Sequence, residues 1–383
     1  MKLQPVFHQK KIAQLQSILA SRGIDVMLVS DPLNIFYLGG FYHTPGERPI
    51  VLGVPGSGQV VLYVPRLEVE HALEGWLKNI ECYFEYPGVT QPLDWIAGQV
   101  AGTWSPKVVA TDNVSHGSFL RLTKGFPKAS VNHEPGIIAE MRAVKEPEEV
   151  VLLKKSAEYC DYGLEVTLEL LRSGREVSEV DVWQHVSDRI MQRMRAEIKE
   201  IVYVGPLTRG LICSGPRSAF PHGLTSSRKI QRGDTVICSY KVFIGAYQAE
   251  SERTFIIGTL TSEHRRFFDL MCQAQRDTRS QIRDGASCSE IDRKCLGWLR
   301  DQGCEKFLMH RTGHGMGLSK HELPWLEEGY REKLRPGNFV SCEPGLYVPG
   351  IGGFRHSDSI LVTPGGAECL TSFTRDAEAL TVK

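Results

Sequence analysis

The chain has 383 residues, and its 45 Lys plus Arg residues balance its 45 Asp plus Glu residues. This length is enough for two domains of ordinary size. Without net charge there is no global field to attract nucleic acid or anionic lipid, so we expect neither as a partner.

The ten cysteines include no C-x-x-C pair, which disfavours a structural zinc site and favours reduced thiols. The N-terminus lacks the apolar core of a signal peptide, and no apolar run reaches membrane-spanning length. We therefore expect a cytoplasmic protein with no membrane partner.

The first third of the chain alternates between predicted helices and strands. It begins with an amphipathic helix over 8–22, a strand over 25–30 and a loop over 34–49. The strands IVLGV and VVLYVP, a helix over 67–78, the strand CYFEY, a helix over 94–100, the strand KVVATD and a helix over 118–124 follow. This alternation indicates a layered α/β domain. The loop carries Phe41 and Arg48, and it is either an ordinary connector or a carrier of binding groups.

A domain boundary is expected near residues 135–147, which gives domains over 1–142 and 143–383. Pro147 suits the first turn of a helix, and 148–171 is the longest helical pattern. Residues 172–181 are echoed at 283–292, where each copy ends a helix at Gly and caps the next helix with Ser, at Ser178 and Ser289. We therefore expect two related α/β halves in the second domain, with a site at their junction.

Residues 233–258 predict a β-hairpin in the first of these halves. An apolar strand starts at Thr235, the chain reverses at Gly245, and 247–257 alternates. The period of two places Glu250 and Glu252 on one face. Two carboxylates on one face indicate either a solvated surface or part of a site.

Three other segments could meet the hairpin at this junction. His222 stands among turn residues, as a surface histidine or a catalytic one. His314 lies between two glycines, which permit close approach of the backbone, and His321 follows it; a plain glycine-rich turn is the alternative. Glu343 ends an apolar strand, where an unpaired carboxylate is costly, and Arg355 lies in the segment that follows.

With the motifs ERTF, GHGMGLSKHE and SCEPGLY in this order, the chain resembles the pita-bread fold group that contains methionine aminopeptidase, aminopeptidase P, prolidase and creatinase. The resemblance covers nearly the whole chain. It implies a small N-terminal α/β creatinase-like domain and a C-terminal pita-bread domain with two pseudo-symmetric halves.

The metallopeptidases of this group hold two metal ions with five ligands. Matched motif to motif, the five positions are Ser239, Glu250, His314, Glu343 and Ser357. Two serines lack the negative charge that holds two cations together. The resemblance therefore implies no dinuclear site, and it leaves open a single ion bound by the other three residues.

The resemblance is closer to the metal-free creatinase branch. There, His222 corresponds to the proton shuttle, and Glu252 and Glu343 to the catalytic glutamates that hold the substrate. Arg48 resembles an arginine that reaches the substrate from the other subunit of a homodimer. The implied substrate-binding residues are Arg48, Phe41, Glu250, His314, His321 and Arg355.

The leading prediction is a metal-independent C–N hydrolase without a cofactor. Its substrate would be a small carboxylated guanidino, amidine or cyclic amidine compound, whose planar cation would pair with carboxylates. Either water, with His222 as base, or a glutamate would attack, the latter as in ectoine hydrolase. Two alternatives remain: a metallopeptidase of the Xaa-Pro aminopeptidase or prolidase type with one divalent ion, and a non-catalytic binding member of the group.

Overall fold

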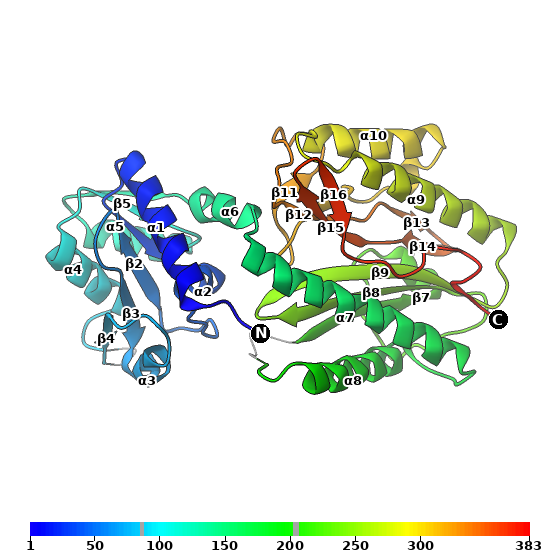
Figure 1. The fold of residues 1–383 in the computed structure, drawn as a ribbon, viewed down its shortest axis with the longest axis horizontal. Helices are drawn as coiled ribbons and strands as arrows, with labels where there is room; N and C mark the ends of the chain where they lie inside the picture. The colour runs from blue at the N-terminus through cyan, green and yellow to red at the C-terminus, as the bar shows by residue number, and fades with distance from the viewer. Residues whose placement is uncertain (85–87, 202–206) are drawn as a thin grey trace. The chain divides into compact units, whose positions relative to one another are not determined.

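The computed structural model describes residues 1–84, 88–201 and 207–383. The chain divides into an N-terminal unit, Leu3–Met141, and a C-terminal unit formed by Arg142–Lys383 together with Met1–Lys2 (Figure 1). Within the described residues no helix is both long and apolar enough to cross a membrane.

The N-terminal unit is built on a mixed sheet with the strand order β4-β3-β2-β1-β5-β6. The strands are β1 (Val26–Val29), β2 (Val51–Pro55), β3 (Val61–Pro65), β4 (Ile80–Tyr83), β5 (Val108–Thr111) and β6 (Ser130–His133). The helices are α1 (Pro5–Ser21), α2 (Pro32–Gly39), α3 (Val69–Leu73), α4 (Pro92–Trp104), α5 (His116–Gly125) and α6 (Gly136–Ala143), with the 3₁₀ turn η1 (Arg66–Glu68). Apolar strand residues such as Leu28 pack against Ile96 and Val100 of α4 in the core.

Two local predictions for this unit need correction. The expected helix over 67–78 is limited to η1 and α3, and Gly75 follows in a turn whose N–H bonds to Ala72 O at 3.1 Å. The expected loop over 34–49 begins inside α2, because the Asp31 side chain accepts hydrogen bonds from two backbone N–H groups and caps that helix. The last residues of the predicted strand CYFEY, 85 and 86, lie outside the described residues.

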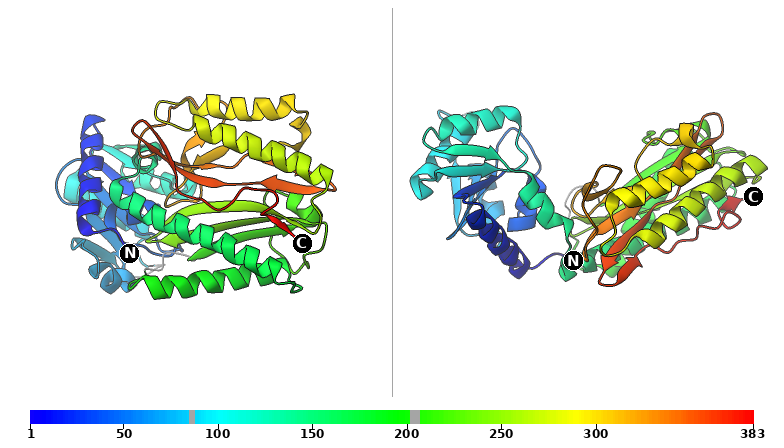
Figure 2. Two further views of the ribbon diagram at one scale, coloured as in Figure 1. Left: turned by 45° about the vertical axis from the view of Figure 1, so that its right-hand side comes forward. Right: turned by 90° about the horizontal axis from the view of Figure 1, so that it is seen from above.

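The C-terminal unit contains two larger sheets with helices on their outer faces. One sheet has the order β17-β9-β8-β7 and contacts α7 and α8, and the other has the order β11-β10-β12-β15-β16 and lies against α9 and α10 (Figures 1 and 2). β13 and β14 form a separate pair. This is the expected α/β domain with two related halves.

The elements of the C-terminal unit follow in chain order. The helices are α7 (Pro147–Arg172), α8 (Glu179–Glu197), α9 (Ser262–Gln281) and α10 (Cys288–Asp301), with the 3₁₀ turns η2 (Gly215–Ala219) and η3 (Glu305–Phe307). The strands are β7 (Thr208–Ser214), β8 (Thr235–Ile244), β9 (Tyr247–Ile257), β10 (Gly313–Gly315), β11 (Glu322–Leu326), β12 (Phe339–Cys342), β13 (Gly345–Val348), β14 (Gly352–Arg355), β15 (Asp358–Thr363), β16 (Gly366–Cys369) and β17 (Thr381–Val382).

Each of the two repeated sequence segments caps one helix, α8 in the first half and α10 in the second. Ser178 caps α8 in a capping box with Asp181, whereas the second copy caps α10 with Ser287 and not with Ser289. Each cap residue also forms an isolated β-bridge, Ser178 with Lys229 and Ser287 with Lys333. In the second half the helix is therefore capped two residues earlier than predicted.

The predicted hairpin is confirmed by β8 and β9. Gly245 and Ala246 both have positive φ values, of 55° and 74°, as a tight two-residue hairpin turn requires. A Cβ at position 245 would also lie 2.9 Å from the Met1 carbonyl oxygen. Glycine is therefore needed there for conformation and for space.

Candidate active site

A cavity of about 520 Å³ opens in the C-terminal unit where the hairpin meets the second sheet. This volume suits a small-molecule substrate. Its lining residues are Arg209, Gly210, Leu211, His222, Ser239, Lys241, Glu250, Glu252, His310, Arg311, His314, Lys320, His321, Glu327, Glu343 and Arg355.

The hairpin contributes one face of this cavity. In the β8–β9 register Lys241 lies opposite Glu250, and Ser239 lies opposite Glu252. Alternate residues share a face, so these four side chains line the same wall. Both glutamates are 1% exposed. The alternative of a solvated outer face is therefore wrong.

Glu250 has both carboxylate oxygens engaged. Lys241 Nζ lies 2.5 Å from Oε2, and Ser357 donates a hydrogen bond of 2.6 Å to Oε1. Burial alone would raise the pKa of Glu250 and lower that of Lys241, but their mutual attraction outweighs burial, so the pKa of Glu250 is lowered and that of Lys241 is raised. Both groups are therefore charged at neutral pH.

His314 forms the second ion pair of the site. Its Nε2 lies 2.9 Å from Glu343 Oε1, and its Nδ1 lies 3.0 Å from the Gly315 carbonyl oxygen. Burial lowers the pKa of His314, but the Glu343 carboxylate reverses this, so the net shift is upward. The pKa of Glu343 lies well below its usual value, because its attraction to His314 outweighs the effect of burial. Since both ring nitrogens face acceptors, the imidazolium form fits this arrangement.

The glycines around His314 are required by packing. A Cβ at Gly313 would lie 2.2 Å from Ser341 O, and one at Gly315 would lie 2.2 Å from Leu323 O. β10 therefore approaches its two neighbouring strands more closely than any side chain would allow. This close approach places His314 in the cavity, so the glycine-rich segment is more than a plain turn.

Glu250, His314 and Glu343 also form a group of potential metal ligands. Their ligand atoms all lie within 4.8 Å of one another. One nitrogen and two carboxylate donors suit one divalent ion with a position left open. Ser239 and Ser357 offer only neutral hydroxyls, so the residues present fit one ion and do not fit two.

Glu252 is occupied by Arg355. The Arg355 Nε donates to Oε1 and its Nη2 donates to Oε2 at 3.1 Å, in a bidentate pair. The Arg355 Nη1 also donates to the Tyr347 hydroxyl at 2.7 Å, and that hydroxyl lies 2.7 Å from His310 Nε2. The charge of Glu252 is therefore compensated within the protein.

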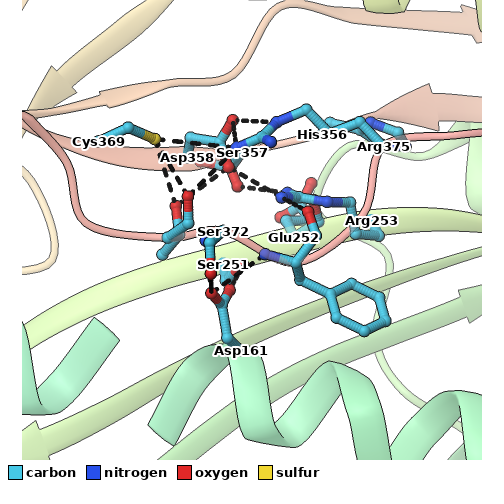
Figure 3. A network of polar contacts seen from close by, with 12 residues as sticks. Asp161, Ser251, Glu252, Arg253, His356, Ser357, Asp358, Cys369, Ser372 and Arg375 are labelled. Atoms are coloured by element: carbon cyan, nitrogen blue, oxygen red, sulfur yellow. Dashed lines mark hydrogen bonds and ion pairs between the residues drawn. The ribbon is translucent and has the colours of Figure 1, made fainter. Parts of the chain in front are cut away.

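An ion-pair cluster behind the cavity fixes the position of Ser357 (Figure 3). Arg253, on the opposite face of β9 from Glu252, donates to Asp358 at 2.9 Å, and both side chains are fully buried. Arg279 and Arg375 also pair with Asp358. Backbone hydrogen bonds of 3.0 and 3.1 Å then join Ser357 to Glu252. Sequence reasoning missed this cluster, because Arg253, Arg279 and Arg375 are far apart along the chain.

His222 and His321 complete the lining of the cavity, and both are exposed residues whose rings are still partly surrounded by protein. Burial and the nearby Lys320 lower the pKa of His222. Burial, His314 and Lys320 lower the pKa of His321 to about 4. The His321 ring lies 4.1 Å from the ring of His314. Both rim histidines are therefore neutral at physiological pH.

A buried carboxylate anchors the loop that carries Lys320 and His321. Glu322 accepts hydrogen bonds from Lys145 Nζ at 2.8 Å and from Arg142 Nη2 at 2.5 Å. It also accepts one from the backbone N–H of Ser319 at 3.2 Å. Sequence reasoning missed this anchor, because nothing near Glu322 in the sequence indicates its distant partners Arg142 and Lys145.

Two predicted site residues belong to the N-terminal unit. Phe41 is buried there, with its ring 4.8 Å from that of His71, and Arg48 pairs with Glu47. Their assignment to the substrate site stays a prediction. The other predicted site residues all line the cavity of the C-terminal unit.

Known proteins resemble this chain over nearly its whole length. The Xaa-Pro dipeptidase of Pyrococcus furiosus is 27% identical over 374 residues, which cover 96% of this chain and 99% of that protein. The solved Xaa-Pro dipeptidase from Bacillus anthracis is 25% identical with a TM-score of 0.84, covering 96% and 99% of the two chains. The solved prolidase from Thermococcus sibiricus is 26% identical with a TM-score of 0.85, covering 98% of each.

These findings overturn the predicted metal-independent C–N hydrolase and the expected absence of a cofactor. The relatives named above are Xaa-Pro dipeptidases or prolidases, and three side chains that could hold a metal ion converge in the cavity. Because Arg355 already pairs with Glu252, that carboxylate is not open to a substrate amidine. Residues 11–144 match the Creatinase/Prolidase N-terminal domain, and residues 151–364, more than half of the chain, match Metallopeptidase family M24. The protein therefore belongs to metallopeptidase family M24, with the pita-bread fold and a creatinase-like N-terminal domain.

Proposed function

We propose that this protein is a dipeptidase of the Xaa-Pro type that works with one divalent ion bound by Glu250, His314 and Glu343. The observation that carries the proposal is the convergence of these three donors in one cavity. The names of relatives that align over 96% of the chain support the choice of substrate. One bound ion, and not two, agrees with the serines at positions 239 and 357.

The chemistry divides between the ion and the side chains at the cavity rim. A divalent ion supplies a Lewis acid that polarises a carbonyl and lowers the pKa of bound water. His222, neutral because burial and Lys320 lower its pKa, would accept a proton from the attacking water and return it to the leaving nitrogen. Burial and the charges of His314 and Lys320 lower the pKa of His321 to about 4, so it remains a neutral hydrogen-bonding group near pH 7.

The cavity also offers cations for the carboxylate of a dipeptide. Lys320 lines it, and within residues 1–84, 88–201 and 207–383 its ammonium makes no hydrogen bond or ion pair. Arg209 also lines the cavity, with its guanidinium 5.4 Å from the Phe243 ring centroid. A carboxylate held by such cations fixes one end of a short peptide.

Assembly as a homodimer is part of the proposal. The motive is the resemblance of Arg48, in the segment 41–48, to an arginine that acts across a subunit interface. In that arrangement the segment of one subunit approaches the cavity of its partner.

The test uses metal-depleted protein with Mn²⁺ added back. Ala-Pro and Leu-Pro should be hydrolysed, and Ala-Leu should be hydrolysed far more slowly. The variant Glu343→Gln should lose both ion binding and hydrolysis. Glu327→Gln is the matched control, because Glu327 is another carboxylate of the cavity lining but pairs with Arg311 at 2.7 Å; it should keep ion binding. Hydrolysis that survives a chelator, or a failure of the Mn²⁺-loaded protein to cleave either Xaa-Pro dipeptide, contradicts the proposal.

A further inference from the structure

Lys241 places a positive charge directly against one of the candidate metal ligands. Its side chain is 14% exposed, and its Nζ lies 2.5 Å from Glu250 Oε2. No role for this lysine follows from the chain's family membership or from the proposed peptidase activity. A cation held inside a metal-binding cavity changes what else can bind there.

The position of Lys241 is set by the hairpin. It lies directly across from Glu250 in the β8–β9 register, two residues after Ser239 on the same face. On the other side of the Glu250 carboxylate, Ser357 donates to Oε1 at 2.6 Å. One oxygen of Glu250 thus meets an ammonium and the other a hydroxyl.

The balance of charge around Glu250 favours one ion. Two neighbouring divalent ions need several carboxylates to offset their mutual repulsion. Ser239 and Ser357 supply no charge, while Lys241 adds a positive one. A second ion beside Glu250 would therefore approach an ammonium with no added carboxylate to compensate it.

We propose that the Lys241 ammonium takes the place of a second divalent ion, limits the cavity to one ion, and competes with that ion for Glu250. The inference rests on the single-ion site of the proposed function. Lys241 is a positioning residue in this account, because it acts through the Glu250 carboxylate. Its removal should alter metal binding itself, and not only turnover.

The first test removes the charge and keeps the length of the side chain. Calorimetric titration of metal-depleted Lys241→Met with Mn²⁺ should show affinity at least about tenfold higher than wild type, since a cation no longer repels the ion. Lys320→Met is the matched control, because Lys320 lines the same cavity but makes no ion pair to Glu250; its affinity should change by less than about threefold. Unchanged or weaker Mn²⁺ binding by Lys241→Met would overturn the inference.

The second test asks whether Lys241 occupies the place of an ion. The double variant Ser239→Asp/Ser357→Glu keeps the lysine and should still bind one Mn²⁺ per chain. Adding Lys241→Gly should raise the stoichiometry to two, as counted by calorimetry and elemental analysis on protein shown to be folded by circular dichroism. Two ions in the double variant, or only one in the triple variant, would overturn the inference.

The outcomes separate this inference from the proposed function. If the wild type binds one ion but cleaves no dipeptide, the peptidase proposal fails. The role of Lys241 is then decided by the number of ions that the variants bind. If the wild type binds no ion, the single-ion site on which both proposals rest is absent, and both fail. If the triple variant does not fold, the Lys241→Met titration decides.

Discussion

The ion pair between Glu252 and Arg355 gives a stability prediction that separates a structural glutamate from a substrate ligand. The side chains are 2% and 7% exposed. In Glu252→Gln the guanidinium keeps hydrogen bonds to the Tyr347 hydroxyl and the Pro221 carbonyl but loses its counter-charge. Breaking a buried pair by removing one partner costs about 3–5 kcal/mol. Because glutamine still accepts a hydrogen bond, we expect a loss of about 3 kcal/mol in the free energy of unfolding.

A double-mutant cycle isolates the pair from other effects. Glu252→Met and Arg355→Met should each be strongly destabilising, whereas the double variant should lose less than the sum by at least about 2 kcal/mol, because neither charge is left alone. Urea unfolding followed by circular dichroism measures all four free energies of unfolding. A coupling energy within about 0.5 kcal/mol of zero, the usual limit of additivity, would refute the reasoning and return Glu252 to the substrate.

Three further predictions concern chemistry and assembly. His222→Asn should lower kcat on Ala-Pro by roughly two to four orders of magnitude, while dipeptide binding measured by calorimetry changes little. If the variant keeps more than about a tenth of wild-type turnover, His222 is not the proton carrier. Glu343 holds the pKa of His314 above its usual value against the effect of burial. At pH values below that pKa, an incoming ion must therefore displace the proton on His314. Mn²⁺ affinity should therefore rise with pH up to the raised pKa and level off above it. Calorimetry at pH 6 in buffers of different ionisation enthalpy should find about one proton released per bound ion. If no proton is released, the imidazolium assignment is wrong. Arg48→Ala should weaken dipeptide binding by about 1.5–3 kcal/mol, as for a hydrogen bond to a charged group, and a fully active monomer in sedimentation would contradict the cross-subunit role.

The sequence predicts the hairpin and the strand-end glutamate because local patterns determine them. Alternation over 247–257 placed Glu250 and Glu252 on one face, and the structure has both in the cavity wall. Glu343 directly follows β12, where the apolar run before it ends. These features depend on near neighbours in the chain.

The errors concern features that depend on distant residues. The two serines led to the leading prediction of a site without metal, which was wrong, whereas the alternative of one ion at Glu250, His314 and Glu343 names the three side chains that converge in the structure. The partner of Glu252 is Arg355, 103 positions away, and no local pattern reveals this pairing. In the sequence Lys241 is a single charged residue in an apolar strand. Its proposed role follows only from the cross-strand register, which places it opposite Glu250.

The single-ion peptidase is tested most directly by an equivalence titration. Metal-depleted protein is supplied with increasing Mn²⁺, and the initial rate of Ala-Pro hydrolysis is measured at each addition. We predict a linear rise that breaks at one equivalent per chain, because Glu250, His314 and Glu343 hold one ion and Lys241 excludes another. A break at two equivalents, or no hydrolysis at any amount of Mn²⁺, would contradict the account.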